Sequence, residues 1–140
     1  MQNQISLGLL FMNCHRILLL DDEAPILDIM SVFLGRNGYE VVCSQTGSQA
    51  LSIFREEYNS KNRFELAILD VSIPGDIGAK ELVGPMKETD PDIKIIITSG
   101  DSLQGVMDNP LKFGFSGSLK KPFRSGDLLK VVETILNDSR

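Results

Sequence analysis

Five side chains of this sequence could together carry out phosphoryl chemistry, and each lies at the end of a segment with strand character: Asp21, Asp22, Asp70, Thr98 and Lys121. Three carboxylates brought close together repel one another unless a cation neutralises them, and oxygen ligands suit Mg2+ when a phosphoryl group shares its coordination. A threonine hydroxyl can donate a hydrogen bond to a phosphoryl oxygen, and a lysine ammonium can pair with the same group. Because a carboxylate can attack phosphorus to form an aspartyl phosphate, Asp70 is the candidate nucleophile.

Such a site forms only if the segments that carry these residues end at the same edge of a sheet. The predicted strands are Ile17–Leu20, Tyr39–Cys43, Leu66–Leu69, Ile93–Ile97 and Ser118–Lys120. The predicted helices are Ala24–Asn37, Gly47–Tyr58, Ala79–Glu88, Ser102–Phe113 and a last one that begins at Ser125. In the first of them, the packed face is predicted to consist of Ile26, Ile29, Met30, Phe33 and Leu34. Gly105 and Pro110 interrupt the fourth, which should therefore be short or irregular.

This alternation of strands and helices predicts an α/β fold. A doubly wound, five-stranded parallel sheet would carry five helices distributed over both of its faces. In such open sheets the ligand site lies outside the carboxyl ends of the strands, where the five candidate side chains would meet.

The motifs at these strand ends resemble those of one known family, the receiver domains of two-component response regulators. The resemblance extends from Arg16 to Leu136 and rests on four motifs: Leu19–Glu23, Leu69–Asp70 with the following Ile73-Pro74-Gly75 and Gly78, Ile97–Gly100, and Lys121–Phe123. The Ile-Pro-Gly loop and the segment Gly114–Phe123 resemble in particular the receivers of hybrid sensor kinases. The resemblance implies a flavodoxin-like sheet of order 2-1-3-4-5, formed by a receiver domain at residues 16–138 after an N-terminal extension at residues 1–15.

The same resemblance implies a role for each acidic residue. Asp70 would accept phosphate from a phosphohistidine of a sensor histidine kinase or of a histidine phosphotransfer domain. Asp22 would bind Mg2+ directly and Asp21 through water, while Asp70 and the backbone carbonyl of Ser72 would complete the protein ligands. Such a domain is regulatory rather than an enzyme, although it assists its own phosphorylation and dephosphorylation. It would change conformation to regulate a partner, and it could form a homodimer.

Thr98 and Lys121 match the switch hydroxyl and the phosphate-pairing lysine of the family, and a cis Lys121–Pro122 peptide would direct the lysine to the site. One position departs from the pattern. Ser118 stands where many receivers carry a Tyr or Phe whose rotation reports phosphorylation. We therefore expect the signal to pass through Thr98 and through the segment that follows Gly100, as far as Ser118.

The composition is typical of one globular domain without a basic surface. In the 140 residues, 14 Lys and Arg face 19 Asp and Glu, which gives a net charge of -5. Direct binding to nucleic acid or to an anionic membrane is therefore not expected. Cys14 and Cys43 lack the spacing of a disulfide framework or a metal site, and two reduced thiols are typical of a cytoplasmic protein.

The apolar segment Ile5–Met12 is the candidate targeting sequence. No Lys or Arg precedes it, and it is too short to span a bilayer, so it does not resemble a signal peptide. We favour an upstream translational start or a leftover linker, with Met12 as a possible true start; a packing or dimerising role is the alternative.

Three other functions compete with the phosphorylated receiver. A haloacid-dehalogenase-type phosphatase needs a second aspartate two residues after the nucleophile, where this chain has Ser72. A flavodoxin-like cofactor binder needs a glycine- or hydroxyl-rich loop after the first strand, where Asp21, Asp22 and Glu23 would repel a phosphate. The remaining alternative is a pseudo-receiver, an interaction module that acts without phosphorylation.

Overall fold

The computed structural model describes residues 15–100 and 109–137 of the chain. Five parallel strands form one sheet in the order β2-β1-β3-β4-β5. The strands are β1 (Arg16–Leu20), β2 (Glu40–Ser44), β3 (Leu66–Asp70), β4 (Lys94–Ser99) and β5 (Gly117–Lys120). The α-helices of the described residues are α2 (Ala24–Arg36), α3 (Gly47–Asn59), α4 (Ala79–Thr89) and α6 (Ser125–Asn137). No helix among these residues is long and apolar enough to cross a membrane.

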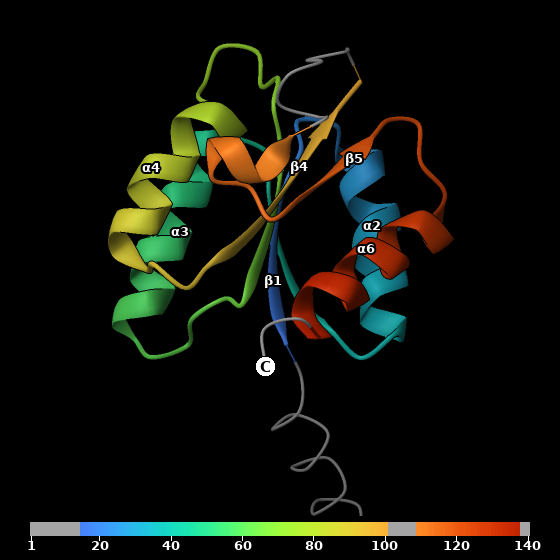
Figure 1. The fold of residues 1–140 in the computed structure, drawn as a ribbon, viewed down its shortest axis with the longest axis horizontal. Coiled ribbons are helices and arrows are strands. Elements are labelled where there is room, and N and C mark those ends of the chain that lie inside the picture. Colours follow the sequence, from blue (N-terminus) through green and yellow to red (C-terminus); the bar gives the residue numbers. More distant parts are fainter. Residues whose placement is uncertain (1–14, 101–108, 138–140) are drawn as a thin grey trace, which may run out of the picture.

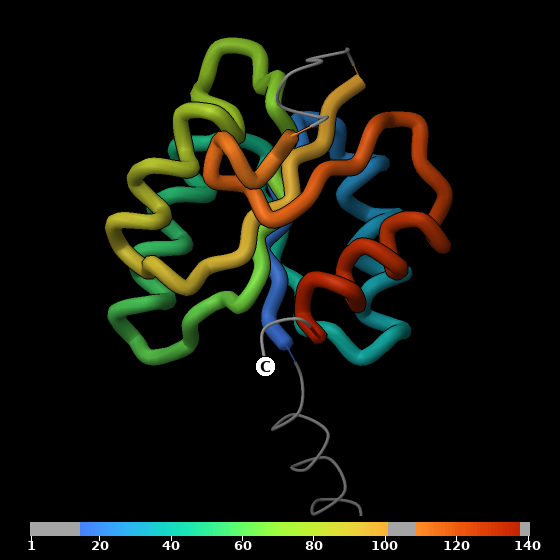
Figure 2. The backbone as a smooth tube through the Cα atoms, in the orientation of Figure 1, coloured from blue at the N-terminus to red at the C-terminus, as the bar shows by residue number. Residues whose placement is uncertain are grey.

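The helices cover both faces of the sheet, as predicted for a doubly wound fold. Figure 1 shows α3 and α4 on one side of the sheet and α2 and α6 on the other, and the tube in Figure 2 follows the connections that place them there. The predicted strand order 2-1-3-4-5 is confirmed. All five predicted strands are present, with bounds that differ from the prediction by one or two residues.

The fourth predicted helix, Ser102–Phe113, is only partly within the described residues. Its first part falls in residues 101–108, which lie outside them. The remainder is a 3-10 helix, η1 (Pro110–Phe113), so the described residues contain four α-helices rather than the five expected. The sequence explains this end of the segment, because Pro110 has no backbone N–H and Gly114, at φ 91°, adopts a left-handed conformation that ends the turn.

The aliphatic runs of the central strands are continuous because both faces of the sheet are covered. In β1, Leu18 and Leu20 pack on the side of α3 and α4, whereas Ile17 and Leu19 pack on the side of α2 and α6. Every residue of β3 is buried. Since neighbouring strand residues point to opposite faces, a strand buried on both faces has no polar alternation, and its polar residues are left to its end.

One helix is oriented differently from the prediction. Ile29 was expected on the packed face of α2, but the buried residues of this helix are Leu27, Met30 and Leu34, and Ile29 is mostly exposed. Both sets of positions fit a helical period of 3.6 residues, so the sequence allowed two rotations of the helix. Packing against β1 and β2 selected the rotation that buries Leu27.

Candidate functional site

The carboxyl ends of two neighbouring strands bring the predicted acidic residues together. Asp21 and Asp22 directly follow β1, and Asp70 is the last residue of β3, the neighbouring strand. One carboxylate oxygen from each of the three lies within 4.8 Å of the others. Thr98 stands beside Asp70 in the sheet, because these two residues are register partners of β4 and β3. Parallel strands end at a common edge, and this edge collects the candidate residues.

Asp21 and Asp70 are held by the same hydrogen-bonding scheme. Each is almost fully buried, and each accepts a hydrogen bond on Oδ1 from the backbone N–H two residues later, at 2.9 Å from Glu23 and 3.1 Å from Ser72. Each also accepts a hydrogen bond on Oδ2 from Lys121 Nζ, at 2.6 Å for Asp21 and 2.8 Å for Asp70. The two carboxylates are therefore fixed by their own loops on one side and share a single ammonium on the other.

Lys121 reaches the site from the turn that follows β5. Its backbone N–H donates to the Ser99 carbonyl at 2.8 Å, and the expected cis peptide joins it to Pro122. Burial by itself would lower the pKa of Lys121, but the hydrogen bonds to Asp21 and Asp70 and the charges of these carboxylates together raise the pKa above its ordinary value. The ammonium stays charged, and it opposes the two buried negative charges.

Asp22 differs from the other two aspartates because its side chain is exposed. Its backbone carbonyl accepts a hydrogen bond from Gln45 Nε2 at 3.2 Å, and its carboxylate lies at the open side of the cluster. An exposed carboxylate beside two buried ones leaves the cluster accessible to a solvated ion.

The donor set of this cluster fits a hard divalent cation. All three side chains offer carboxylate oxygens, and Mg2+ prefers such oxygen ligands. Softer metals prefer nitrogen or sulfur ligands. Among the described residues, a single ammonium, that of Lys121, pairs with two of these three carboxylates. Within residues 15–100 and 109–137, no other group of three His, Cys, Asp or Glu side chains comes close enough to hold a metal ion.

The loop between β3 and α4 is packed tightly at this edge, and two glycines allow it. A Cβ atom on Gly78 would lie 2.3 Å from the carbonyl oxygen of Val71, and one on Gly47 would lie 1.9 Å from the carbonyl oxygen of Ile77. Any side chain at either position would displace the loop that carries Ser72. The close approach of backbone to backbone therefore fixes the position of this loop.

Asp76 is a contributor to this loop that the sequence did not reveal. Its Oδ1 accepts hydrogen bonds from the backbone N–H and the hydroxyl of Ser48, at 3.2 and 2.8 Å, and from the Ile77 N–H at 2.6 Å. These hydrogen bonds tie the loop to the first turn of α3, and they lower the pKa of Asp76, with the Ser48 hydroxyl the largest cause. An aspartate that follows a glycine in a loop is typical of such turns, and this was the available signal.

The structure also places Ser118, the position at which this chain departs from the family pattern. Ser118 lies in β5 opposite Ile97, so no aromatic ring stands at this place. Phe115 is buried in the core and Phe113 is partly exposed on η1. Part of the expected signalling segment, residues 101–108, lies outside the described residues.

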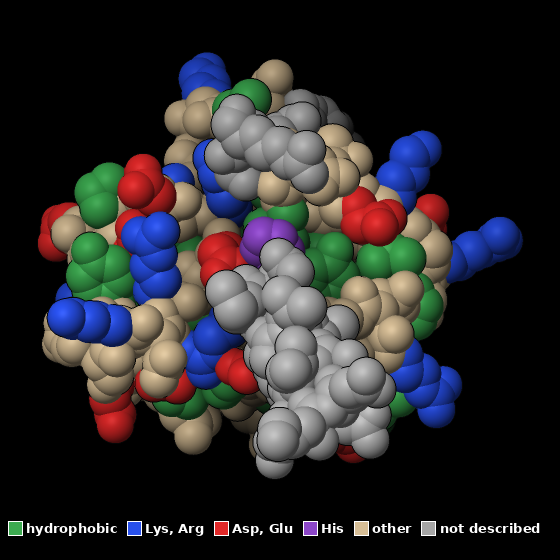
Figure 3. All heavy atoms as spheres, turned by 90° about the horizontal axis from the view of Figure 1, so that it is seen from below, with side chains coloured by type: hydrophobic (Ala, Val, Ile, Leu, Met, Phe, Trp, Pro, Cys, Tyr) green, Lys and Arg blue, Asp and Glu red, His purple; other side chains and the backbone are tan. Residues whose placement is uncertain are grey.

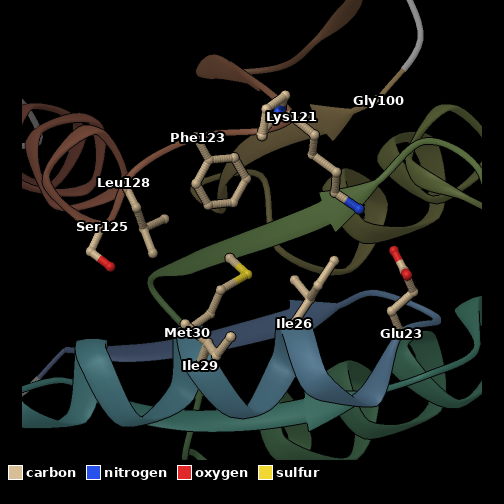
Figure 4. Close-up of a pocket in the computed structure, with 10 residues that line it drawn as sticks. Glu23, Ile26, Ile29, Met30, Gly100, Lys121, Phe123, Ser125 and Leu128 are labelled. Atoms are coloured by element: carbon tan, nitrogen blue, oxygen red, sulfur yellow. The ribbon is translucent and has the colours of Figure 1, made fainter.

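An apolar groove of about 520 Å³ opens beside Lys121. Figure 4 shows its lining: Ile26, Ile29 and Met30 rise from α2, Phe123 and Leu128 face them from the turn after β5 and from α6, and Glu23 and Lys121 lie at one end. The sequence analysis missed this groove because it assigned Ile29 to the core.

Comparison with known proteins identifies the family. The model of the response regulator receiver domain matches residues 17–133 of this chain. The chain belongs to this family. The receiver domain is 33% identical over 122 residues to a protein of Porphyra purpurea named "Probable transcriptional regulator ycf27", a match that covers 87% of this chain and 47% of that protein. This receiver domain therefore spans about half the length of such curated relatives.

Solved structures agree with the family assignment. A CheY-like response regulator receiver domain protein from Methanospirillum hungatei JF-1 is 28% identical, with a TM-score of 0.80 over 91% of this chain and 97% of that one. A response regulator receiver domain protein from Clostridium thermocellum is 27% identical, with a TM-score of 0.78 over 89% of this chain and 95% of that one. The resemblance inferred from the strand-end motifs is thus confirmed.

Proposed function

We propose that this receiver domain accepts phosphate on Asp70 from a phosphohistidine, in a reaction that requires Mg2+, and changes conformation to regulate a partner. The observation that carries the proposal is the position of Lys121 Nζ, 2.8 Å from Asp70 and 2.6 Å from Asp21 at the edge where three carboxylates meet. The phosphate donor would be a sensor histidine kinase or a histidine phosphotransfer domain. The domain would be regulatory and not an enzyme in the ordinary sense.

The transfer is a displacement at phosphorus. A carboxylate oxygen of Asp70 forms the new P–O bond while the P–N bond to the donor imidazole breaks, and the released imidazole nitrogen takes up a proton. A phosphorylated Asp70 can no longer share the lysine as it does in the free protein, and the ammonium would pair with the phosphoryl oxygens instead. Thr98, the neighbour of Asp70 in the sheet, is the hydroxyl that could donate to the same group.

The metal ligands of the proposal are those implied by the family resemblance. Asp22 and Asp70 would bind Mg2+ directly, together with the backbone carbonyl of Ser72, and Asp21 would act through water. When bound, Mg2+ would neutralise the charge that gathers on the phosphoryl oxygens during transfer. The exposed position of Asp22 beside two buried carboxylates supports this assignment.

We expect the protein to act in the cytoplasm. Cys43 is an unpaired, exposed cysteine, and such thiols persist in a reducing compartment.

The pseudo-receiver is the competing function, and one experiment separates the two. The protein is incubated with acetyl phosphate and Mg2+, and its intact mass is measured. The active receiver gains one base-labile phosphoryl group, and EDTA prevents the gain. A protein that gains no phosphoryl group under these conditions would be a pseudo-receiver.

Asp70→Asn should abolish the phosphoryl adduct while the circular dichroism spectrum stays unchanged, because the residue lies at the edge of the sheet. Glu57→Gln is the matched control, since it removes a carboxylate charge at the amino edge of the sheet, away from the site, and it should retain the adduct. A base-labile phosphate on the Asp70→Asn protein would show that another residue is the nucleophile.

A further inference from the structure

The outer face of α2 carries apolar side chains that the fold leaves uncovered. Ile29 is 65% exposed and Val32 is 52% exposed, and both are on this face. They line a shallow hollow between α2 and the start of α6, together with Asp28, Phe33, Arg36 and Ser125. A soluble domain gains by covering neighbouring apolar side chains of this size, so the face is a candidate interface.

The charges on this face have opposite signs at its two ends. Asp28 lies one turn before Val32 and Arg36 lies one turn after it. Eight residues of helix separate these two charges by about 12 Å, which is too far for them to pair with each other. Neither forms an ion pair with another of the described residues. Each charge is therefore available to a group outside the domain.

This arrangement is complementary to itself. Asp28, Val32 and Arg36 lie four residues apart and form one ridge on the helix surface, and Ile29 and Phe33 belong to the ridge beside it. In the commonest class of helix packing, ridges of this kind run alongside one another at a crossing angle of about -50°. If a second copy is antiparallel, its Arg36 comes beside Asp28 of the first copy, and the reverse pair forms at the other end.

We propose that two copies of this chain associate through α2, with the helices antiparallel and Val32 near the two-fold axis. Val32 of each copy packs against the apolar ridge of the other, and two Asp28–Arg36 ion pairs close the interface at its ends. A two-fold axis satisfies both charges of both copies at once and produces a closed dimer. The proposal does not depend on phosphorylation. It assigns the face to a second copy because Asp28 and Arg36 of one copy lie opposite Arg36 and Asp28 of an antiparallel copy.

The dimer should be weak. One pair of helices buries less surface than the roughly 1,600 Å² of a standard stable interface. We therefore expect a dissociation constant in the micromolar range or above, and a mass that rises with protein concentration.

Sedimentation equilibrium of the full chain over a range of concentrations tests the interface. Val32→Glu places two like charges at the axis and should raise the dissociation constant more than tenfold. Leu111→Glu is the matched control, because Leu111 is another large, exposed apolar residue but lies on η1, away from α2. It should leave the association unchanged. A wild-type chain that is monomeric throughout, or a Val32→Glu chain that still dimerises, would overturn the proposal and leave the face for a different protein.

A mixing experiment tests the antiparallel arrangement. Asp28→Arg puts arginine beside arginine at both ends of a homodimer, and Arg36→Asp puts aspartate beside aspartate, so each variant alone should be monomeric. Mixed in equal amounts they restore both ion pairs, and the mixture should form a heterodimer as tight as the wild-type dimer. Failure of the mixture to associate would refute the antiparallel register. Both substitutions are at exposed positions, so the fold should be retained, and acetyl phosphate labelling of each variant would report separately on the phosphorylation site.

Discussion

Two cations at opposite edges of the sheet have the same number of ion-pair partners and the same side-chain exposure. Arg16 lies at the amino edge and forms ion pairs with Glu40 and Glu57; Lys121 lies at the carboxyl edge and forms ion pairs with Asp21 and Asp70. Each of the two cationic side chains is 17% exposed. Figure 3 views the molecule from the amino edge of the sheet, where acidic and basic side chains lie next to one another.

The difference lies in their surroundings. The carboxylates of Glu40 and Glu57 are 47% and 28% exposed, whereas those of Asp21 and Asp70 are 3% and 5% exposed. Arg16 is further held by a hydrogen bond to the Asn62 carbonyl and by its position 4.6 Å from the centre of the Phe64 ring.

The guanidinium of Arg16 makes several directional contacts and has a structural role. If Arg16 is removed, water can solvate its acidic partners. A lysine is a point charge on a flexible stem, and here it opposes carboxylates that are almost fully buried. The comparison teaches that equal numbers of ion pairs can differ in what they support: the buried carboxylates of Asp21 and Asp70 depend on Lys121 for their counter-charge, whereas water shares the charge of Glu40 and Glu57.

The largest expected difference follows from removing each cation. Lys121→Met leaves two buried carboxylates without their counter-charge and should lower the free energy of unfolding by about 3 kcal/mol. Arg16→Met should lower it by about 1 kcal/mol, because its partners are solvated. Urea unfolding in the presence of EDTA measures both. An equal or larger loss for Arg16→Met would contradict the distinction between the two edges.

The second prediction concerns Mg2+, which would bind at the carboxylates that Lys121 opposes. Mg2+ should stabilise the wild-type protein at its carboxyl edge by about 1.4 kcal/mol at ten times its dissociation constant, if only the folded form binds it. Asp22→Ala should remove most of this stabilisation because it deletes a proposed direct ligand, whereas Glu57→Ala at the amino edge should leave it unchanged. Thermal unfolding with and without Mg2+ provides the measurement. Full stabilisation of Asp22→Ala would show that the metal binds elsewhere.

The third prediction compares two variants of the metal-free protein, each of which loses one negative charge at one edge of the sheet. Asp70→Asn relieves repulsion within the cluster of three carboxylates, two of which share the ammonium of Lys121, and it should raise the free energy of unfolding by about 1 kcal/mol. Glu57→Gln should not raise it, because its carboxylate is solvated and paired with Arg16. Melting temperatures of the metal-free proteins give the comparison, and an unchanged or lower value for Asp70→Asn would argue against a crowded acidic cluster.

The smallest effect concerns a carboxylate that is partly exposed. The folded-state pKa of Asp76 is lowered, so its contribution to stability is present above the unfolded value of about 4 and is lost as the pH falls through the folded value. Asp76→Asn should therefore be less stable than the wild type at neutral pH, with a difference that shrinks steadily below pH 4. Urea unfolding from pH 7 to pH 2 tests this expectation. A difference that stays constant over this range would mean that the Ser48 contacts do not depend on the charge.

The sequence was sufficient to predict the sheet because few arrangements can bury its apolar strands on both faces. A run such as Leu66–Leu69 has no polar alternation, which requires cover on both faces and hence helices between the strands. Parallel strands then bring Asp21, Asp70 and Thr98 to one edge without any knowledge of packing. The four strand-end motifs taken together led to the family resemblance and with it to the strand order.

The sequence by itself determined which residues meet at the carboxyl edge; the tertiary structure decided how they are held and what stays uncovered. The rotation of α2, which exposes Ile29, depends on contacts with β1 and β2, and helical periodicity allows both rotations. The sharing of Lys121 between Asp21 and Asp70 depends on distances that a few ångströms of strand stagger would change. The link from Asp76 to Ser48 joins residues that are adjacent only after the sheet has formed. Local patterns encode the faces and ends of elements, whereas their relative positions are fixed by packing between segments far apart in the chain.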